Sequence, residues 1–324
     1  MDGKGWRAGF ITFLKGVAMG AADIVPGVSG GTIALITGVY QRLIASLDAI
    51  DHRLWGLFQD KGIRAVWRHI DGNFLLVLLL GILSSILSLA KFLHFLLKDH
   101  PILIWSFFFG LIAASIYFVG KRASKWSGGN IVSFLIGTGC ALAITLLPPM
   151  ATPDQDYIFF FAGLLAISAM ILPGISGSFI LVLLGAYQAV LGAIKELDLA
   201  ILGFMAAGCG VGLLTFSKVL NWMFRRYHDL TIALMSGFLL GSLNKVWPWK
   251  TTWELSPWTS VLKDPSKVWV WELVPGDGKA GTNRFPAHFA QLTDQDPELF
   301  LAILSGLLGA AIVVVLEGTS KERA

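Results

Sequence analysis

The chain is poor in charge and in cysteine. Only 14% of its 324 residues are Asp, Glu, Lys or Arg, whereas 55% are hydrophobic and the mean hydropathy is +0.69. A soluble protein of this length would carry more charge, so the composition excludes an ordinary soluble domain. The two cysteines, Cys140 and Cys209, both lie in apolar segments. This position favours small buried side chains over a disulfide framework or a metal site.

The sequence also lacks the common motifs of cofactor chemistry. It contains no Walker-type phosphate loop and no glycine fingerprint for a dinucleotide, and its six histidines show no metal-ligand spacing. We therefore expect no cofactor and no metal. The isoelectric point near 9.0 does not favour a nucleic acid as partner, because an excess of Lys and Arg in cytoplasmic loops explains it better.

Long apolar segments make up most of the remaining sequence. Six of them are about long enough to cross a bilayer, and we predict spans at 74–97, 102–120, 130–148, 199–221, 229–246 and 299–317. Two further apolar segments, 7–47 and 157–195, are each interrupted by Pro-Gly. Each of these predicts a re-entrant helical hairpin, which enters the membrane and leaves on the same side. The predicted fold class is an all-α polytopic membrane protein.

The Pro-Gly interruption occurs twice, at an offset of 147 residues, and the ungapped match extends beyond it. The matched pairs include Pro26/Pro173, Gly27/Gly174, Ser29/Ser176, Gly30/Gly177, Gly38/Gly185, Tyr40/Tyr187 and Gln41/Gln188. At an offset of 127 residues, Gly81/Gly208, Lys91/Lys218, Gly110/Gly237 and Ser115/Ser242 also coincide. We predict two repeats, 1–150 and 151–324, each a hairpin followed by three spans. Because three is odd, the second repeat would be inverted in the membrane.

The distribution of Lys and Arg predicts the orientation. If the N-terminus is cytoplasmic, thirteen Lys and Arg lie in cytoplasmic segments, against two, Lys98 and Lys195, in short outer loops. Both termini are then on the cytoplasmic side. The long outer loop 247–298 contains six of the twelve tryptophans. These predict an aromatic belt at the membrane interface, and a gate or a contact with lipid headgroups is the alternative.

The two interruptions predict an anion site. After Pro-Gly the chain resumes a helix whose first N–H groups have no partner within the helix, while glycine leaves them uncovered and serine adds donors. Hairpins that enter from opposite faces would bring both tips together near the middle of the membrane. The alternative is a tight turn that only permits close packing. The candidate substrate-binding residues of the tips are Pro26, Gly27, Ser29, Gly30, Gly31, Thr32, Pro173, Gly174, Ser176, Gly177 and Ser178.

Four charged residues complete the candidate site. Asp23 is the one carboxylate inside an apolar segment and away from its ends. It could carry a coupling proton or Na⁺, pair with a lysine, or simply bond free N–H groups at a helix end. Lys91 and Lys218 occupy matching positions inside spans and could balance an anionic substrate or snorkel to the interface. Arg42, after the first tip, could bind substrate or belong to the positive cytoplasmic charge.

The residues around the first interruption resemble a known family. The run 22–32, which includes Asp23, Pro26 and Ser29 and is followed by Gly38 and Tyr40, is similar to the bacterial polyprenyl-phosphate transporter family. The run 172–178, Gly241-Ser242-Leu243 and Trp247-Pro248-Trp249 fit the same family, so the resemblance covers essentially the whole chain. It implies that undecaprenyl phosphate, the lipid carrier of cell-wall synthesis, is recycled from the outer to the inner leaflet of the cytoplasmic membrane.

A second resemblance is to undecaprenyl-pyrophosphate phosphatases, which also have inverted repeats and Pro-Gly-x-Ser motifs. In those enzymes the Ser is followed by Arg, and paired glutamates with a His supply the chemistry. Here Ser29 and Ser176 are each followed by glycine, and neither tip contains Glu or His. A hydrolase without such groups is disfavoured, so we expect no enzyme but a lipid flippase that works by alternating access among membrane lipids. An intramembrane phosphatase and an anion channel stay open as alternative functions. The protein could also form a homo-oligomer.

Overall fold

The computed structural model describes residues 3–25, 28–153, 155–250, 253–254, 272–273, 283–293 and 295–321. Within these ranges the secondary structure is helical apart from β1 (Trp253–Glu254) and β2 (Glu272–Leu273), which pair antiparallel. Five helices are long and apolar enough to cross a membrane: α5 (Gly72–Asp99), α6 (Pro101–Gly120), α7 (Gly128–Leu146), α11 (Leu199–Arg226) and α14 (Leu299–Lys321). The predicted all-α polytopic membrane fold is confirmed.

The remaining predicted span, 229–246, corresponds to a shorter helix. This helix, α12 (His228–Ser242), has 15 residues and is buried along most of its length. At a rise of about 1.5 Å per residue it is roughly 22 Å long, less than the hydrocarbon thickness of about 30 Å. The short length is consistent with its interior position, because a helix surrounded by other helices need not match the lipid.

Both apolar segments with a Pro-Gly sequence are broken helices. The first forms α1 (Gly3–Ile24), α2 (Gly30–Ile36) and α3 (Tyr40–Asp48), and the second forms α8 (Ile158–Ile171), α9 (Gly177–Leu183) and α10 (Tyr187–Glu196). We keep the name hairpin for each of these two segments; their re-entrant course stays a prediction. Gly38 and Gly185 have φ angles of 76° and 67° at the second turn of each hairpin, a left-handed conformation that favours glycine. The axes of α9 and α10 differ by 105°.

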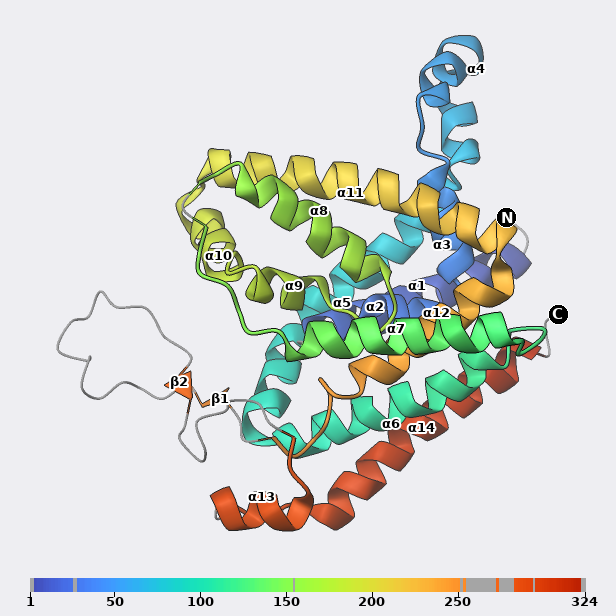
Figure 1. The fold of residues 1–324 in the computed structure, drawn as a ribbon. Helices are drawn as coiled ribbons and strands as arrows, with labels where there is room; N and C mark the ends of the chain where they lie inside the picture. Colours follow the sequence, from blue (N-terminus) through green and yellow to red (C-terminus); the bar gives the residue numbers. More distant parts are fainter. Residues whose placement is uncertain are drawn as a thin grey trace.

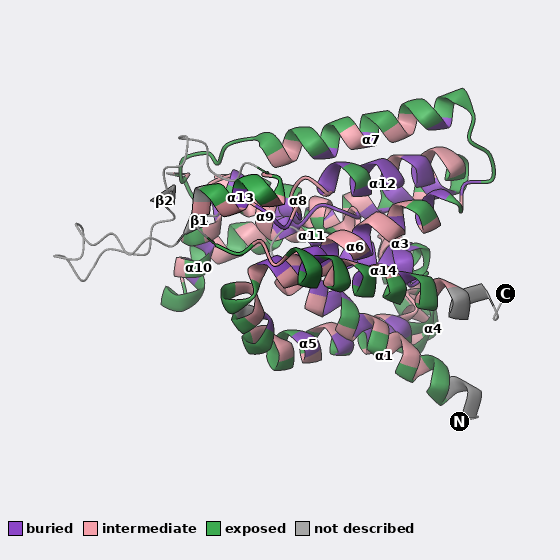
Figure 2. Ribbon diagram, turned by 90° about the horizontal axis from the view of Figure 1, so that it is seen from below, coloured by how far each residue is buried: buried purple, intermediate pink, exposed green. Residues whose placement is uncertain are grey.

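The helices pack in matching pairs. α1 packs along α5 and α8 along α11, while α6 packs along α14 and α7 along α12 (Figure 1). Both chain ends and α4 (Arg53–His69) lie on one side of the molecule, and α13 (Pro286–Thr293) lies on the opposite side with the β pair. Figure 2 shows that buried residues gather on α12, whereas its neighbour α7 is largely exposed. Apolar side chains such as Leu87 (84% exposed) cover the outer surface, as expected where lipid is the solvent.

The same glycines bring helices together in both halves of the chain. In the first half Gly81 of α5 faces the carbonyl of Phe13 and the Cα of Gly16. In the second half Gly208 of α11 faces the carbonyl of Phe160, at the sequence offsets found for the repeated motifs. The other helix pairs repeat this pattern, because Gly110, Gly137, Gly237 and Gly309 face the carbonyls of Gly306, Leu234, Phe134 and Phe107, respectively.

These close approaches predict a sharp difference between two glycines of α11. A methyl group at Gly208 would collide with the Phe160 carbonyl, whereas a methyl group at Gly210 would meet no atom within 4 Å. We expect Gly208→Ala to lower the free energy of unfolding by about 1–3 kcal/mol. Gly210→Ala should be neutral or slightly stabilising, because alanine favours helix. Thermal unfolding of both purified variants in detergent tests this, and equal melting temperatures would contradict the packing.

Candidate substrate site between the hairpins

The first tip satisfies its own backbone. Ser29 has an extended conformation and caps α2, since its hydroxyl accepts a hydrogen bond from the Gly31 N–H at 3.1 Å. The Asp23 carboxylate accepts the Gly30 N–H at 2.6 Å, and the Thr32 N–H donates to the Ser29 carbonyl. The first N–H groups of α2 therefore already have partners inside the protein. This geometry matches the helix-end alternative for Asp23; Pro26 and Gly27 lie outside the described residues.

The two hairpins meet directly. The Gly174 N–H donates to the Thr32 hydroxyl at 2.8 Å, and the Tyr40 hydroxyl donates to the Ile171 carbonyl at 3.0 Å. The Ser29 hydroxyl lies 3.2 Å from the Leu172 carbonyl. These bonds join the starts of α2 and α3 to the end of α8 and to the residues that follow it. The last carbonyls of a helix lack partners within the helix. Of the predicted tip residues, the structure thus places Ser29 and Thr32 of the first tip against Leu172 and Gly174 at the second.

The second tip differs from the first. Ser176 is again extended at the start of α9, but its side chain makes no capping bond; its hydroxyl lies 2.9 Å from that of Ser178. Met170 stands at the position that matches Asp23, so this tip has no corresponding carboxylate. Gly174 has a φ of 86°, and a Cβ there would lie 2.9 Å from the Phe238 carbonyl. A side chain at Gly174 would be both strained and crowded.

The other charged candidates lie apart from the tips. Arg42 forms an ion pair with Asp71 at 2.6 Å and is exposed. Lys91 and Lys218 are exposed on α5 and α11. Within the described ranges no ion pair joins Asp23 to either lysine, and its carboxylate bonds the Gly30 N–H instead. The suggested Asp23–lysine pairing is therefore not found.

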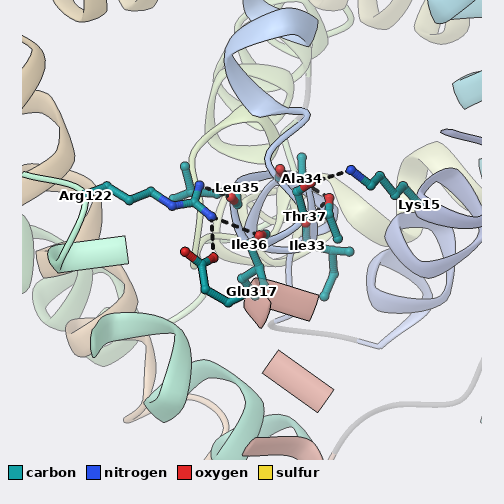
Figure 3. A network of polar contacts seen from close by, with 8 residues as sticks. All are labelled: Lys15, Ile33, Ala34, Leu35, Ile36, Thr37, Arg122 and Glu317. Atoms are coloured by element: carbon teal, nitrogen blue, oxygen red, sulfur yellow. Dashed lines mark hydrogen bonds and ion pairs between the residues drawn. The ribbon is translucent and has the colours of Figure 1, made fainter. Parts of the chain in front are cut away.

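A charged network that the sequence did not indicate holds the other end of α2 (Figure 3). The Arg122 guanidinium donates to the carbonyls of Leu35 and Ile36 at 2.7 and 3.1 Å, and it pairs with Glu317 of α14 at 2.9 Å. The Lys15 ammonium donates to the Thr37 carbonyl at 2.6 Å. Cations are favourable at the negative end of a helix. In sequence, Arg122 is indistinguishable from other positive charges in a cytoplasmic loop.

Two cavities flank the contact between the hairpins. One, of about 150 Å³, is lined by Leu35, Gly38, Tyr40, Gln41, Arg122, His228 and Ile232. The other, of about 10 Å³, lies beside the second tip and is lined by Ala141, Ile144, Thr145, Gly174, Ile175, Ser176, Phe179 and Lys245. The second has room for about one water molecule. Sequence reasoning missed Lys245, because it follows α12 without any recognisable motif.

Two tryptophans of the predicted outer belt pack inward. Trp249 is 8% exposed, contacts Phe289 of α13, and donates from its indole N–H to the Pro297 carbonyl at 2.9 Å. The Trp247 indole donates to the Arg284 carbonyl at 2.8 Å. The indole N–H groups of both residues therefore have backbone partners within the protein, and the aromatic belt at the membrane interface stays a prediction. The side chains of the other four tryptophans of the loop lie outside the description.

The broken helices and apolar surface define a multi-pass helical membrane protein whose two interrupted segments meet in its interior. The chain belongs to the VCA0040-like family, described as undecaprenyl phosphate translocase-like, whose profile matches residues 19–260. The family resemblance noted in the sequence is thereby confirmed.

Two curated relatives support the assignment. The chain is 43% identical over 308 residues to a polyprenyl-phosphate transporter of Vibrio cholerae serotype O1, covering 94% of this chain and 95% of the relative. It is 36% identical over 258 residues to a polyprenyl-phosphate transporter of Staphylococcus aureus, covering 74% and 86%. No solved structure matches the chain.

The bond between the hairpins predicts the effect of an isosteric change at Thr32. Thr32→Val removes the acceptor of the buried Gly174 N–H, so we expect a loss of about 1–3 kcal/mol in the free energy of unfolding. Thr37→Val is the control, because the Thr37 hydroxyl bonds a carbonyl of its own helix that also accepts the Thr37 N–H. Thermal unfolding in detergent compares them. A Thr32→Val protein as stable as Thr37→Val would mean that the bond is unimportant.

Proposed function

We propose that the protein transports polyprenyl phosphate, in bacteria undecaprenyl phosphate, across the cytoplasmic membrane so that the carrier lipid is reused in peptidoglycan synthesis. The phosphate binds between the hairpin tips, and the polyprenyl chain stays in the lipid. One observation carries this proposal: in a member of this family, Gly174 of one tip bonds Thr32 of the other inside the molecule. Paired helix breaks at such a position are typical of substrate sites in secondary transporters.

The difference between the tips suggests how the phosphate is held. The first tip is already occupied by the Asp23 carboxylate, whereas the Ser176 and Ser178 hydroxyls bond only each other among the described residues. A phosphate can replace that hydroxyl pair with two charge-assisted hydrogen bonds, which are about twice as strong as neutral ones. The second tip is therefore the primary phosphate site, and the first tip closes over it.

The two cavities are the basis for proposing alternating access. One is lined by Tyr40 of the first hairpin, and the other by Gly174 and Ser176 of the second. Both chain ends lie on one side of the molecule (Figure 1). We assign that side to the cytoplasm because the Lys- and Arg-rich segments gather there. Two inverted repeats, supported by the matching glycine contacts, would rock about the hairpin contact and expose the phosphate to either side.

Asp23 supplies a route for coupling to a proton. Its carboxylate accepts the Gly30 N–H, and protonation removes the charge that strengthens this bond. A proton arriving from outside would loosen the first tip while the phosphate binds the second. A Na⁺ ion could neutralise the same carboxylate. If transport were an exchange of lipids that is not coupled to either ion, Asp23 would neither be protonated nor bind Na⁺ during transport.

Reconstituted transport tests the proposed site. Ser176→Ala removes one hydrogen bond to the phosphate, and we expect transport of labelled polyprenyl phosphate in liposomes to fall about tenfold or more. Ser168→Ala, in the same hairpin, is the control because its hydroxyl bonds only the Leu164 carbonyl. Equal rates for both variants would place the site elsewhere. Release of inorganic phosphate would instead indicate a phosphatase, and a steady ion current would indicate a channel.

The coupling role of Asp23 is tested with Asp23→Asn. The amide still accepts the Gly30 N–H but cannot be protonated, so the fold and lipid binding should persist. Wild-type transport should accelerate as the pH on the outer side falls, whereas transport by Asp23→Asn should be independent of pH. Rates measured in liposomes across a range of outer pH values distinguish the two. An unchanged pH profile in Asp23→Asn would remove Asp23 from coupling.

A further inference from the structure

Two lysines follow the end of α12, and the first of them, Lys245, lies beside the second hairpin. The Lys245 ammonium lies 4.1 Å from the centre of the Phe179 ring in α9. The Lys250 ammonium donates to the Lys245 carbonyl and lies 5.7 Å from the Trp105 ring. Both side chains are partly buried. α12 begins near the chain ends and runs toward the opposite side, so these cations lie on the side assigned to the outer leaflet.

The two cations have no described anionic partner. None of the ion pairs formed by the described residues includes Lys245 or Lys250. Burial, with a smaller contribution from the Lys245 charge, lowers the pKa of Lys250 to about 7. A cation withdrawn from water is costly unless an anion compensates it. An arriving anion would stabilise both ammonium groups, so this pair of lysines favours an anionic ligand.

The surroundings of Lys245 fit a phosphate attached to an apolar chain. Lys245 shares its cavity with the hydroxyl-bearing residues Thr145 and Ser176, and the rest of the lining is largely apolar. The Asn244 amide donates to the Thr145 hydroxyl at 2.9 Å and so orients it. The ammonium group and the hydroxyls offer charge and hydrogen bonds to a phosphate, and the apolar lining beside them offers a hydrophobic surface to the attached chain.

We propose that Lys245, assisted by Lys250, receives the phosphate on the outer side of the transporter and passes it to Ser176. The ligand is a phosphate monoester on an apolar chain. This inference rests on the proposed function and adds its outer recognition residue. In the present conformation the space beside Ser176 is about 10 Å³, so Lys245 covers the site from its position on Phe179. The phosphate draws the ammonium off the ring and opens the path to the tip.

Binding to the purified full chain tests the proposal with three probes: a soluble prenyl monophosphate, the matching prenyl alcohol and inorganic phosphate. Lys245→Gln should weaken binding of the prenyl monophosphate about tenfold or more and leave binding of the alcohol unchanged. Lys245→Arg should keep most of the affinity. Lys195→Gln is the matched control, because Lys195 is an exposed lysine of α10. A Lys245→Gln protein that binds the monophosphate as tightly as Lys195→Gln would overturn the proposal.

A protection experiment on the wild-type chain makes the result independent of folding in the variants. The prenyl monophosphate should protect Lys245, more than Lys195, from an amine-modifying reagent, as measured by mass spectrometry. Equal modification of Lys245 with and without the monophosphate would contradict the proposal.

The outcomes of these experiments also distinguish a lipid phosphate from free inorganic phosphate as the ligand. Wild-type transport combined with unchanged Lys245→Gln binding would reject Lys245 but leave the proposed function standing. Binding of inorganic phosphate through Lys245, without binding or transport of any prenyl phosphate, would reject the lipid substrate and leave a free-phosphate site.

Discussion

The hydrogen-bonded contact between the two broken helices is the constraint on which the rest of the structure depends. Backbone N–H and C=O groups freed by a helix break cannot be left unpaired inside a membrane. Here the breaks pair with each other, since Thr32 accepts the Gly174 N–H and the Tyr40 hydroxyl donates to the Ile171 carbonyl. The glycine-lined helix pairs around them allow the backbones to approach closely enough for these short side chains to reach.

The two hairpin tips are paired, but their hydrogen-bond partners differ. In the first tip an internal carboxylate, Asp23, occupies the backbone donors, and Arg122 and Lys15 fix the far end of the same helix. The second tip has Met170 in place of the acid and hydroxyls that bond each other. One hairpin is thus held by bonds within the protein, and the proposed function assigns the phosphate to the other.

Much of this architecture could be predicted because local patterns determine it. The apolar runs gave the long helices to within a few residues, since the bilayer thickness sets their length, and Pro-Gly marked both helix breaks. Arg122, Glu317 and Lys245 could not be found in this way. Arg122 bonds Leu35 and Glu317 across 87 and 195 residues, and no local pattern records such a contact. The contact of Trp249 could not be predicted either, because its partner Pro297 lies 48 residues away.

The most direct test of the central claim is an experimental structure of the protein with polyprenyl phosphate bound in a lipid bilayer. The account predicts the phosphate group between the two hairpins, within hydrogen-bonding distance of the Ser176 or Ser178 hydroxyl, with the polyprenyl chain leading into lipid. A phosphate group held on the outer surface of the bundle, for example beside Lys91 or Lys218, with both hairpin tips still bonded to each other, would contradict it.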